Sequence, residues 1–545
     1  FKTTFSYDYT TVKGEKWYDP RTSNGEDENG EVVKRIREYK KMVWSNTLSY
    51  LTTFNNIHHL DFLAGYEIDD TYNDYLSGEA YNFTTPDKHA ISNGMKTVSV
   101  GGSDSRYRLV SYLSRLNYDY KNKYYLGASF RVDGSSRLHR DNRWGTFWSV
   151  SGAWRTIEEE FMQPVKDWLT DLRIRASYGV NGTLPSDYFG YMGLSSISGG
   201  YLEQPGIQMS QIANPNLKWE TNYNMNIGLD FGFWDRLNFT IEYYTRTTKN
   251  LLMDCPVSMT TGFSSYLMNI GEVKNKGIEL TINSTNIKIK DFSWNTTFNL
   301  GHNSNKVVKL DGEQTQIVSG TQIHKVGSSY RTFYVQEFAG INPETGNPLF
   351  YTNELDENGN YIKEITENSK NAQFIPYKHA EPTVNGGISN SLRYKWLDLN
   401  FLFSYQFGGY SYDSRAQRTE HGVYDSYANI PTYYRDSGKK PGDQTNIEVY
   451  MLGKSSSVSM HKITSSRRIH STDYFRLKNI TFGITLPKEW TNKINIGNVR
   501  FYASASNLWT WAAYDNYDPE AVSAGSATQT TPPLKTVTFG LNINF

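Results

Sequence analysis

Two short acidic stretches contain the residues best suited to hold a metal ion, GEDENGE at 25–31 and DENGN at 356–360. Closely spaced carboxylate and amide oxygens are ligands that calcium prefers. An EF-hand loop, however, needs glycine at its sixth position, where Val32 and Tyr361 stand in these two stretches. We therefore expect both stretches to be solvated loops, and the sequence predicts no resident metal ion.

Groups that could carry out catalysis are equally sparse. The ten histidines are scattered, and no HExxH, GxSxG, P-loop or dinucleotide-binding GxGxxG motif is present. His58 and His59 are adjacent, but they fall at a predicted turn, where we expect solvated side chains rather than ligands. The lone Cys255 excludes an internal disulfide, a zinc–thiolate cluster and a CxxC redox pair. The sequence predicts no catalytic residue and no cofactor, and hence a protein that is not an enzyme.

Composition reduces the number of protein classes that remain possible. Lys plus Arg and Asp plus Glu both number 56 in 545 residues, so no net field favours nucleic acid as a partner. No apolar run approaches the length of a membrane-spanning helix, so a membrane protein with this sequence would have to be a β-barrel. The 41 Tyr, 27 Phe and 13 Trp are residues that favour strands and membrane interfaces.

The elements that must position the side chains are alternating strands. In the terminal TVTFGLNINF, apolar residues occupy every second position: Val537, Phe539, Leu541, Ile543 and Phe545. The same alternation recurs at 124–132, 148–154, 172–178, 237–243 and 499–505, with polar residues between the apolar ones: Tyr125, Ser129, Arg131, Arg173, Arg175, Asn238, Glu242, Arg500 and Ser504. Strands of roughly ten residues with one apolar and one polar face are typical of a transmembrane barrel around a wet lumen.

Sixteen such segments can be placed with alternating direction, short periplasmic turns and longer external loops. They are 1–10, 38–54, 58–69, 106–120, 123–133, 144–155, 169–180, 219–232, 235–248, 272–285, 291–302, 382–394, 396–408, 473–486, 497–508 and 534–545. The longest external connections are predicted at 303–381 and 409–472. The segment 330–340 also has strand character, but we place it inside the first of these excursions.

Tryptophans are concentrated at the ends of the predicted strands, as in the aromatic girdles of a barrel. Those at the predicted periplasmic ends are Trp154, Trp168, Trp234, Trp294, Trp396 and Trp490. Those near the external ends are Trp17, Trp144, Trp219, Trp509 and Trp511.

Several stretches resemble the barrel of SusC-type TonB-dependent outer-membrane transporters of Bacteroidetes. They are YDYKNKYYLGASFRVDGSSRL, RWGTFWSVSGAWR, LRIRASYGVNGT, NPNLKWETNYNMNIGLDFGFWDRLNFTIEYYTRTTKNLL, NIGEVKNKGIELTIN, INPETGNPLFY, YFRLKNITFGITLP, ASNLWTWAAYDNYDPE and TFGLNINF, in family order across 118–545. The resemblance implies an all-β, antiparallel barrel of about 22 strands around a plug. Residues 1–545 would then be the C-terminal part of that barrel, with the plug and about six N-terminal strands absent.

The resemblance also implies a function: import of oligosaccharides or oligopeptides across the outer membrane. Implied partners are a SusD-like surface lipoprotein, TonB acting through the plug absent from this chain, an N-terminal fragment of the same transporter, and the lipid bilayer. Thr538, Gly540, Ile543 and Phe545 resemble the terminal signal read by the barrel-assembly machinery. Neither the residues nor the resemblance identifies substrate-binding positions.

Three other classes can be weighed against this one. A complete 16-stranded general porin fits the number of segments but not the very long external loops. A barrel protease or lipase would need a nucleophile and base cluster that the sequence lacks. A soluble lectin-like or propeller protein predicts a short repeat period, which is not seen.

Overall fold

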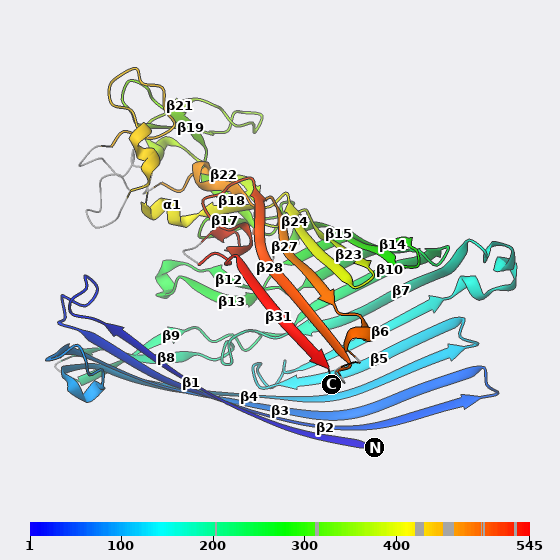
Figure 1. Ribbon diagram of the computed structural model, residues 1–545. Helices are drawn as coiled ribbons and strands as arrows, with labels where there is room; N and C mark the ends of the chain where they lie inside the picture. Colours follow the sequence, from blue (N-terminus) through cyan, green and yellow to red (C-terminus); the bar gives the residue numbers. More distant parts are fainter. Residues whose placement is uncertain are drawn as a thin grey trace. The chain divides into compact units, whose positions relative to one another are not determined.

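The computed structural model describes residues 1–201, 204–310, 315–419, 430–450, 463–491, 493, 496–527 and 531–544. Strands dominate it, and sixteen of them form one large sheet whose strand order follows the chain (Figure 1). Among the described residues, no helix has both the length and the apolar character needed to cross a membrane. The all-β, antiparallel fold class predicted from the sequence is confirmed.

Each of the sixteen predicted segments overlaps one strand of the large sheet. In sheet order these are β1 (Lys2–Tyr18), β2 (Glu31–Phe54), β3 (His58–Phe83), β4 (Gly94–Tyr120), β5 (Tyr124–Ser135), β6 (Trp144–Trp154), β7 (Leu169–Thr183), β10 (Glu220–Phe233), β11 (Leu237–Lys249), β14 (Glu272–Lys288), β15 (Phe292–Lys309), β23 (Val384–Tyr394), β24 (Leu397–Phe407), β27 (Tyr474–Thr485), β28 (Asn498–Ala512) and β31 (Thr536–Asn544). The first four are longer than predicted, at 17, 24, 26 and 27 residues.

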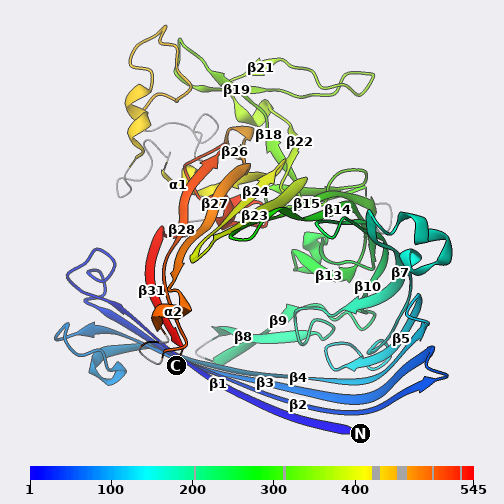
Figure 2. The ribbon, with the colours of Figure 1, turned by 45° about the vertical axis from the view of Figure 1, so that its right-hand side comes forward.

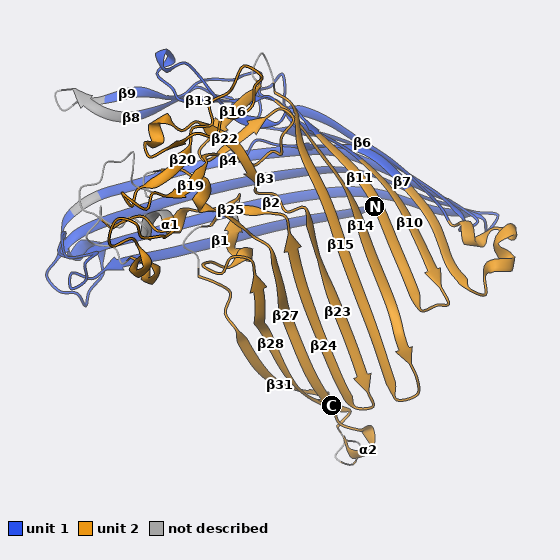
Figure 3. Cartoon of the chain, turned by 90° about the horizontal axis from the view of Figure 1, so that it is seen from above, with its two compact units in different colours: residues 1–154, 176–224, 248–270 blue, residues 155–175, 225–247, 271–545 orange. Residues whose placement is uncertain are grey.

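The chain divides into two compact units, which are coloured separately in Figure 3. Unit 1 comprises Phe1–Trp154, Ala176–Asn224 and Thr248–Ile270, and unit 2 comprises Arg155–Arg175, Met225–Thr247 and Gly271–Phe545. Each unit is described by itself below.

Tight turns connect the strands at the end that the sequence assigns to the periplasm. Lys121 and Asn122, which join β4 to β5 in unit 1, both have a φ of 54°. In unit 2, Trp234 and Asp235 between β10 and β11 have φ values of 51° and 54°. Two successive residues with positive φ are the signature of the hairpin turn that matches strand twist, so each turn fixes the register of its hairpin.

The two faces of the strands differ as the alternation predicts. On β5 of unit 1, Leu126 and Phe130 are 61% and 50% exposed on the apolar face. On the opposite face, Arg131 donates to Asp133 at 2.7 Å and to Ser111 at 2.8 Å. Soluble proteins rarely expose long rows of large apolar side chains to water, whereas the outer face of a membrane barrel presents such rows to lipid. The apolar face of this sheet therefore has the chemistry of a lipid-facing wall.

The 303–381 excursion folds into two small sheets at one end of the neighbouring strands of unit 2 (Figures 1 and 2). One has four strands, β16 (Gln316–Ser319), β17 (Gln322–Lys325), β18 (Thr332–Gln336) and β22 (Phe374–His379). The other has three strands, β19 (Phe338–Ile341), β20 (Pro348–Tyr351) and β21 (Ile365–Thr366). The segment 330–340 supplies β18 and β19, so it belongs to the excursion and not to the large sheet, as predicted.

The remaining elements are short. A further four-stranded sheet contains β26 (Ile469–Ser471), β25 (Tyr410–Asp413), β30 (Ser526–Ala527) and β29 (Val522–Ser523), and two hairpins are formed by β8 (Leu194–Tyr201) with β9 (Gln204–Gln211) and by β12 (Leu252–Pro256) with β13 (Ser265–Asn269). The described residues also include two short helices, α1 (Ser414–Thr419) and α2 (Lys488–Thr491), and several 3-10 turns, among them η2 (Thr156–Glu158), η3 (Glu160–Val165) and η11 (Pro519–Ala521). Part of the predicted 409–472 excursion lies outside the described residues.

Trp219 corrects the girdle predicted from the sequence. It is 9% exposed and packs edge-on against Phe147, with ring centroids 5.3 Å apart, in a cluster with Leu138 and Leu217. Its ring nitrogen donates to the carbonyl of Arg143 at 3.0 Å. The ring fits because Gly182 of β7 has no side chain, and an added Cβ there would lie 2.9 Å from it. Trp219 is thus a core residue of unit 1 rather than an interfacial one.

Leu541 and Asn542 test the assignment of the two faces. Leu541 is 51% exposed on the apolar face of β31, opposite Phe501 of β28. Replacing Leu541 with Arg should cost about 2–4 kcal/mol, because a guanidinium would enter lipid. Asn542 lies opposite Arg500, whose charge Asp398 balances at 2.6 Å, so Asn542→Arg should cost at most about 1 kcal/mol. Urea unfolding in lipid vesicles measures both, and equal losses would overturn the assignment.

Candidate functional site

The histidine pair and the cysteine do not form a chemical centre. His58 and His59 are consecutive strand residues and so point to opposite faces. His58 Nδ1 lies 2.7 Å from the Tyr118 hydroxyl, and His59 Nδ1 lies 3.0 Å from the Thr53 hydroxyl. Cys255 is buried in the hairpin of β12 and β13. Within the described part of the chain, no three His, Cys, Asp or Glu side chains are grouped closely enough to hold a metal ion.

The acidic stretch 356–360 forms a turn. The Asp356 carboxylate accepts from the backbone N–H groups of Asn360 at 2.7 Å and Asn358 at 2.9 Å, and Gly359 has a φ of 80°. The hydrogen bond from the Asn360 backbone, with the others, holds the pKa of Asp356 below its usual value. The carboxylate oxygens are used by the turn itself, which is the behaviour of an Asx turn.

The polar face of unit 2 is a wall that contains several ion pairs, although the Nε of Arg173 on β7 is buried without a partner among the described residues. Arg175 on β7 donates to Asp230 on β10 and to Glu242 on β11, both at 2.7 Å. The carboxylate of Asp398 on β24 accepts a hydrogen bond from the guanidinium of Arg500 on β28 at 2.6 Å. Such cross-strand pairs satisfy the polar groups of the wall and cancel their charges locally. The sequence singled out Arg175, Glu242 and Arg500 as polar-face residues, and the structure supplies their partners.

Hydroxyl and amide side chains continue this wall between the ion pairs. Thr481 of β27 bonds to Ser504 of β28 at 2.9 Å, and Asn479 donates to the same hydroxyl at 3.2 Å. These strands lie side by side in Figure 2, with β31 next to β28. The result is a surface that can exchange hydrogen bonds with a passing polar solute without attracting either sign of charge.

The most deeply buried charge of the large sheet is Arg476 on β27. Its side chain is 2% exposed, and its guanidinium donates to Asp518 at 2.6 Å, to Thr510 at 2.9 Å and also to Glu520. Lys478 contacts the Glu520 carboxylate at 2.6 Å. A buried guanidinium is tolerated only with such complete pairing, and the planar fork of arginine suits two carboxylates at once.

The acidic partners are presented by a short corner after β28. Asp518 caps η11 by accepting from the backbone N–H of Glu520 at 2.9 Å, with Pro519 at the first helical position. Proline and a capping aspartate are favoured at these two positions, so the sequence Asp-Pro-Glu forms the corner locally. Burial alone would raise the pKa of Glu520, but the hydrogen bond from Lys478 and the charge of Arg476 lower it.

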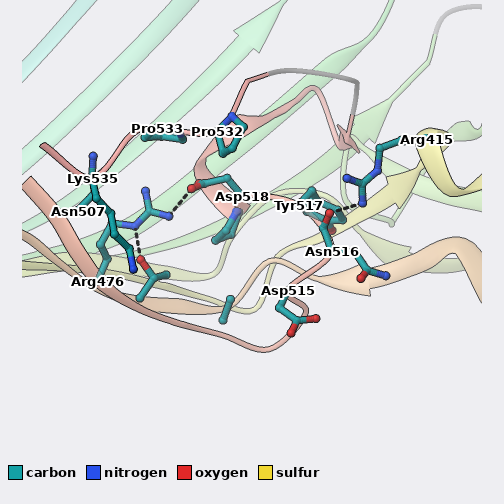
Figure 4. A pocket seen from close by; sticks show the side chains of 13 residues that line it. Arg415, Arg476, Asn507, Asp515, Asn516, Tyr517, Asp518, Pro532, Pro533 and Lys535 are labelled. Atoms are coloured by element: carbon teal, nitrogen blue, oxygen red, sulfur yellow. Dashed lines mark hydrogen bonds and ion pairs between the residues drawn. The ribbon is translucent and has the colours of Figure 1, made fainter. Parts of the chain in front are cut away.

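This cluster forms part of the lining of an open cavity of about 370 Å³, shown in Figure 4. Its other lining residues are Arg415, Asn507, Ala512, Asp515, Asn516, Tyr517, Pro532, Pro533 and Lys535. Asn507 donates to the carbonyl of Leu534 at 3.1 Å, while its Oδ1 is buried without a partner among the described residues. In the same described part, the side chains of Asp515 and Lys535 make no hydrogen bond or ion pair. The cavity is suited to a polar ligand that carries donors and acceptors.

Three of the four predicted assembly residues lie on the edge strand β31. Thr538 faces Ser504, Gly540 faces Tyr502 and Ile543 faces Val499, all on β28. A Cβ at Gly540 would overlap the ring of Tyr502, so this glycine has a packing role that the sequence did not reveal. Phe545 lies outside the described residues.

Sequence reasoning missed the Arg476 cluster. Its two halves, YFRLKN and YDNYDPE, are more than forty residues apart, as the separation of 42 between Arg476 and Asp518 shows. The available signal was an arginine and a lysine two positions apart in one strand, followed by a later acidic corner that could neutralise them.

Comparison with known proteins adds to this geometry. A family model described as TonB dependent receptor-like, beta-barrel matches residues 1–361. TonB-dependent receptor P3 of Formosa agariphila is 31% identical over 100% of this chain and 56% of its own length. TonB-dependent receptor SusC of Bacteroides thetaiotaomicron is 29% identical over 95% and 51%. The RagAB peptide transporter structure aligns with a TM-score of 0.87 at 26% identity, covering 100% of this chain and 60% of that one. The chain spans about half the length of the curated relatives it matches.

Arg476 and Arg106 offer a matched test of the buried cluster. Arg476→Gln leaves Asp518 and Glu520 without their main partner, so it should destabilise the fold by about 3–5 kcal/mol. Arg106 is 52% exposed and shares Asp70 with Arg108, so Arg106→Gln should cost less than about 1 kcal/mol. Denaturant midpoints followed by tryptophan fluorescence compare the two. A loss for Arg476→Gln no larger than the control's would mean that the cluster adds nothing to stability.

Proposed function

The chain belongs to the TonB-dependent receptor-like β-barrel family, and from that premise we propose that it is the C-terminal part of the barrel of an importer that takes up oligosaccharides or oligopeptides. The family is one of outer-membrane transporters rather than enzymes, and this places the chain in the outer membrane. The observation that carries the proposal is the sheet itself, sixteen strands with an exposed apolar face and a charge-paired polar face. Those faces suit lipid on one side and a hydrated pathway on the other.

Additional N-terminal strands would complete this barrel. β1 and β31 are the edge strands of the sheet order, with 17 and 9 residues. In lipid, each of these edges needs a backbone partner along its membrane-spanning length. About six further strands between them, giving a barrel of about 22, would satisfy both edges and leave space for a plug. The relatives' greater length and the family match favour this arrangement over a complete 16-stranded porin.

The partners follow from the same premise. A plug contributed by the N-terminal part would receive energy from TonB, and a SusD-like surface lipoprotein would cover the external opening. The similarity to SusC and to the RagAB transporter supports both partners. The excursions at 303–381 and 409–472 would face the external medium, where the first folds into small sheets of its own.

The terminal strand would also direct assembly. We include Thr538, Gly540, Ile543 and the terminal Phe545 as the signal read by the barrel-assembly machinery, since a strand with one unpaired edge and an apolar face is ready for insertion. The packing of Gly540 against Tyr502 gives one of these residues a second role in the finished barrel.

The intact mass of the transporter tests the proposal that residues 1–545 form only part of the barrel. The transporter purified from its native membrane should contain residues 1–545 together with an N-terminal part, either continuous with it or tightly bound, so the species should exceed 62.6 kDa. Native mass spectrometry before and after denaturation distinguishes the two forms. A single 62.6 kDa species that conducts ions as an open pore would instead identify a complete porin.

Energised uptake tests the transport proposal. Cells that carry the transporter should accumulate labelled oligopeptides or oligosaccharides, and a protonophore should abolish accumulation, because TonB draws on the proton gradient. Cells lacking the gene are the control. Uptake that persists after the gradient collapses would contradict energised import and favour passive diffusion through a pore.

A further inference from the structure

The 303–381 excursion contains a cavity of its own, of about 480 Å³. Its lining comes from the four-stranded sheet of β16, β17, β18 and β22 and from the turn that follows β20. We propose that this cavity is a subsite for a neutral sugar residue of an oligosaccharide. The inference rests on the proposed importer function, and it locates sugar recognition in the excursion, outside the strands of the large sheet.

Three aromatic rings provide the apolar part of the subsite. Tyr334 of β18 and Phe374 of β22 lie on neighbouring strands, with ring centroids 5.5 Å apart and planes tilted by 36°. Tyr361 belongs to the turn that follows β20 and also lines the cavity. Tyr361 is 43% exposed and Phe374 is 40% exposed. Rings of this kind offer flat apolar faces with little conformational freedom to lose on binding, and the C–H face of a pyranose can stack on such a surface.

The acidic stretch 356–360 is the scaffold for Tyr361. The turn held by Asp356 closes a β-bridge between Leu355 and Tyr361, which places both side chains at the cavity. The ammonium of Lys363 lies 5.9 Å from the centre of the Tyr361 ring. Lys363 is itself held by the buried Asn353 at 2.9 Å and by Glu337. The ring is therefore held in place before a ligand binds, which lowers the conformational entropy that binding must remove.

The polar part of the lining has unused hydrogen-bonding capacity. Among the described residues, the side chains of Gln316, Lys325, Glu354 and Gln373 make no hydrogen bond or ion pair. Two amides, one ammonium and one carboxylate supply both donors and acceptors, while their charges sum to zero. Sugar hydroxyls both donate and accept, so they can use this mixture fully. An ionic ligand would gain no net attraction from it.

A peptide is the competing occupant, and the lining fits it less well. Extended peptides are usually held by backbone pairing to a strand edge, with pockets for alternate side chains. Here the unused groups are side-chain amides and charges placed around aromatic rings, in a cavity whose volume lies within the range of small-ligand sites. That combination favours a compact polyhydroxylated ring.

The test uses the complete transporter, solubilised in detergent, on a printed array of neutral oligosaccharides and on a pentapeptide library. We expect wild type to bind at least one oligosaccharide from the array. Tyr361→Ala and Gln373→Ala should each weaken that binding by about tenfold, since each removes one stacking or hydrogen-bonding contact. Tyr377→Ala is the matched control, because Tyr377 lies on β22 with similar exposure, 39%, but does not line the cavity.

Two outcomes would overturn the proposal. One is that wild type binds no oligosaccharide on the array, or binds with an affinity that neither variant changes. The other is that a pentapeptide binds and Tyr361→Ala abolishes its binding, which would assign the cavity to peptides. Energised uptake of a labelled nutrient, measured in parallel, separates this result from the importer proposal. Uptake that is unchanged while the subsite fails would leave the importer in place without a sugar site in the excursion.

Discussion

Backbone pairing in lipid is the constraint on which this structure depends. A bilayer offers no partner to a free N–H or C=O group, so every strand needs a hydrogen-bonded neighbour on each edge. The chain meets this demand for fourteen of its sixteen main strands by placing consecutive strands of the large sheet beside one another, joined by tight turns at one end and longer loops at the other. Side chains are then free to differ completely on the two faces. That freedom explains how a chain with only 38% hydrophobic residues can present a continuous apolar surface.

The same constraint explains why the strands could be predicted from sequence. Alternation has a period of two, and a slip of one residue would move every apolar side chain to the wrong face, so the pattern is kept through each crossing. The lengths of β2 to β4 were underestimated because the apolar alternation ends before the pairing does. Beyond Ile68, for example, β3 continues through Asp69 and Asp70, whose partners are Lys41, Arg106 and Arg108 on the adjacent strands. Strand pairing outside the membrane needs only matched polar neighbours. The apolar alternation, which extends only across the membrane, therefore does not predict it.

The candidate site was less predictable because its contacts are distant in sequence. Alternation identified the polar-face residues Arg175, Glu242 and Arg500, but it did not show which residues pair, since a strand pattern fixes faces and not registers. Trp219 was misplaced for a related reason. Its position next to a strand end suggested the membrane interface. Its ring instead packs in the core of unit 1, in the space left by Gly182 and edge-on against Phe147. Complementary shapes of this kind have no local signature.

Paired and unpaired polar side chains suit different roles. On the wall of unit 2, Arg175, Arg476 and Arg500 are all neutralised by carboxylates on neighbouring segments. A pathway benefits from this, because a solute that must leave as well as enter should meet weak, repeated contacts rather than one strong site. Uncommitted side chains also line the cavity next to the Arg476 cluster and the cavity of the 303–381 excursion. Loops of that kind can change without disturbing the pairing of the wall. In the proposed importer, specificity can therefore diverge between relatives while the paired sheet stays the same.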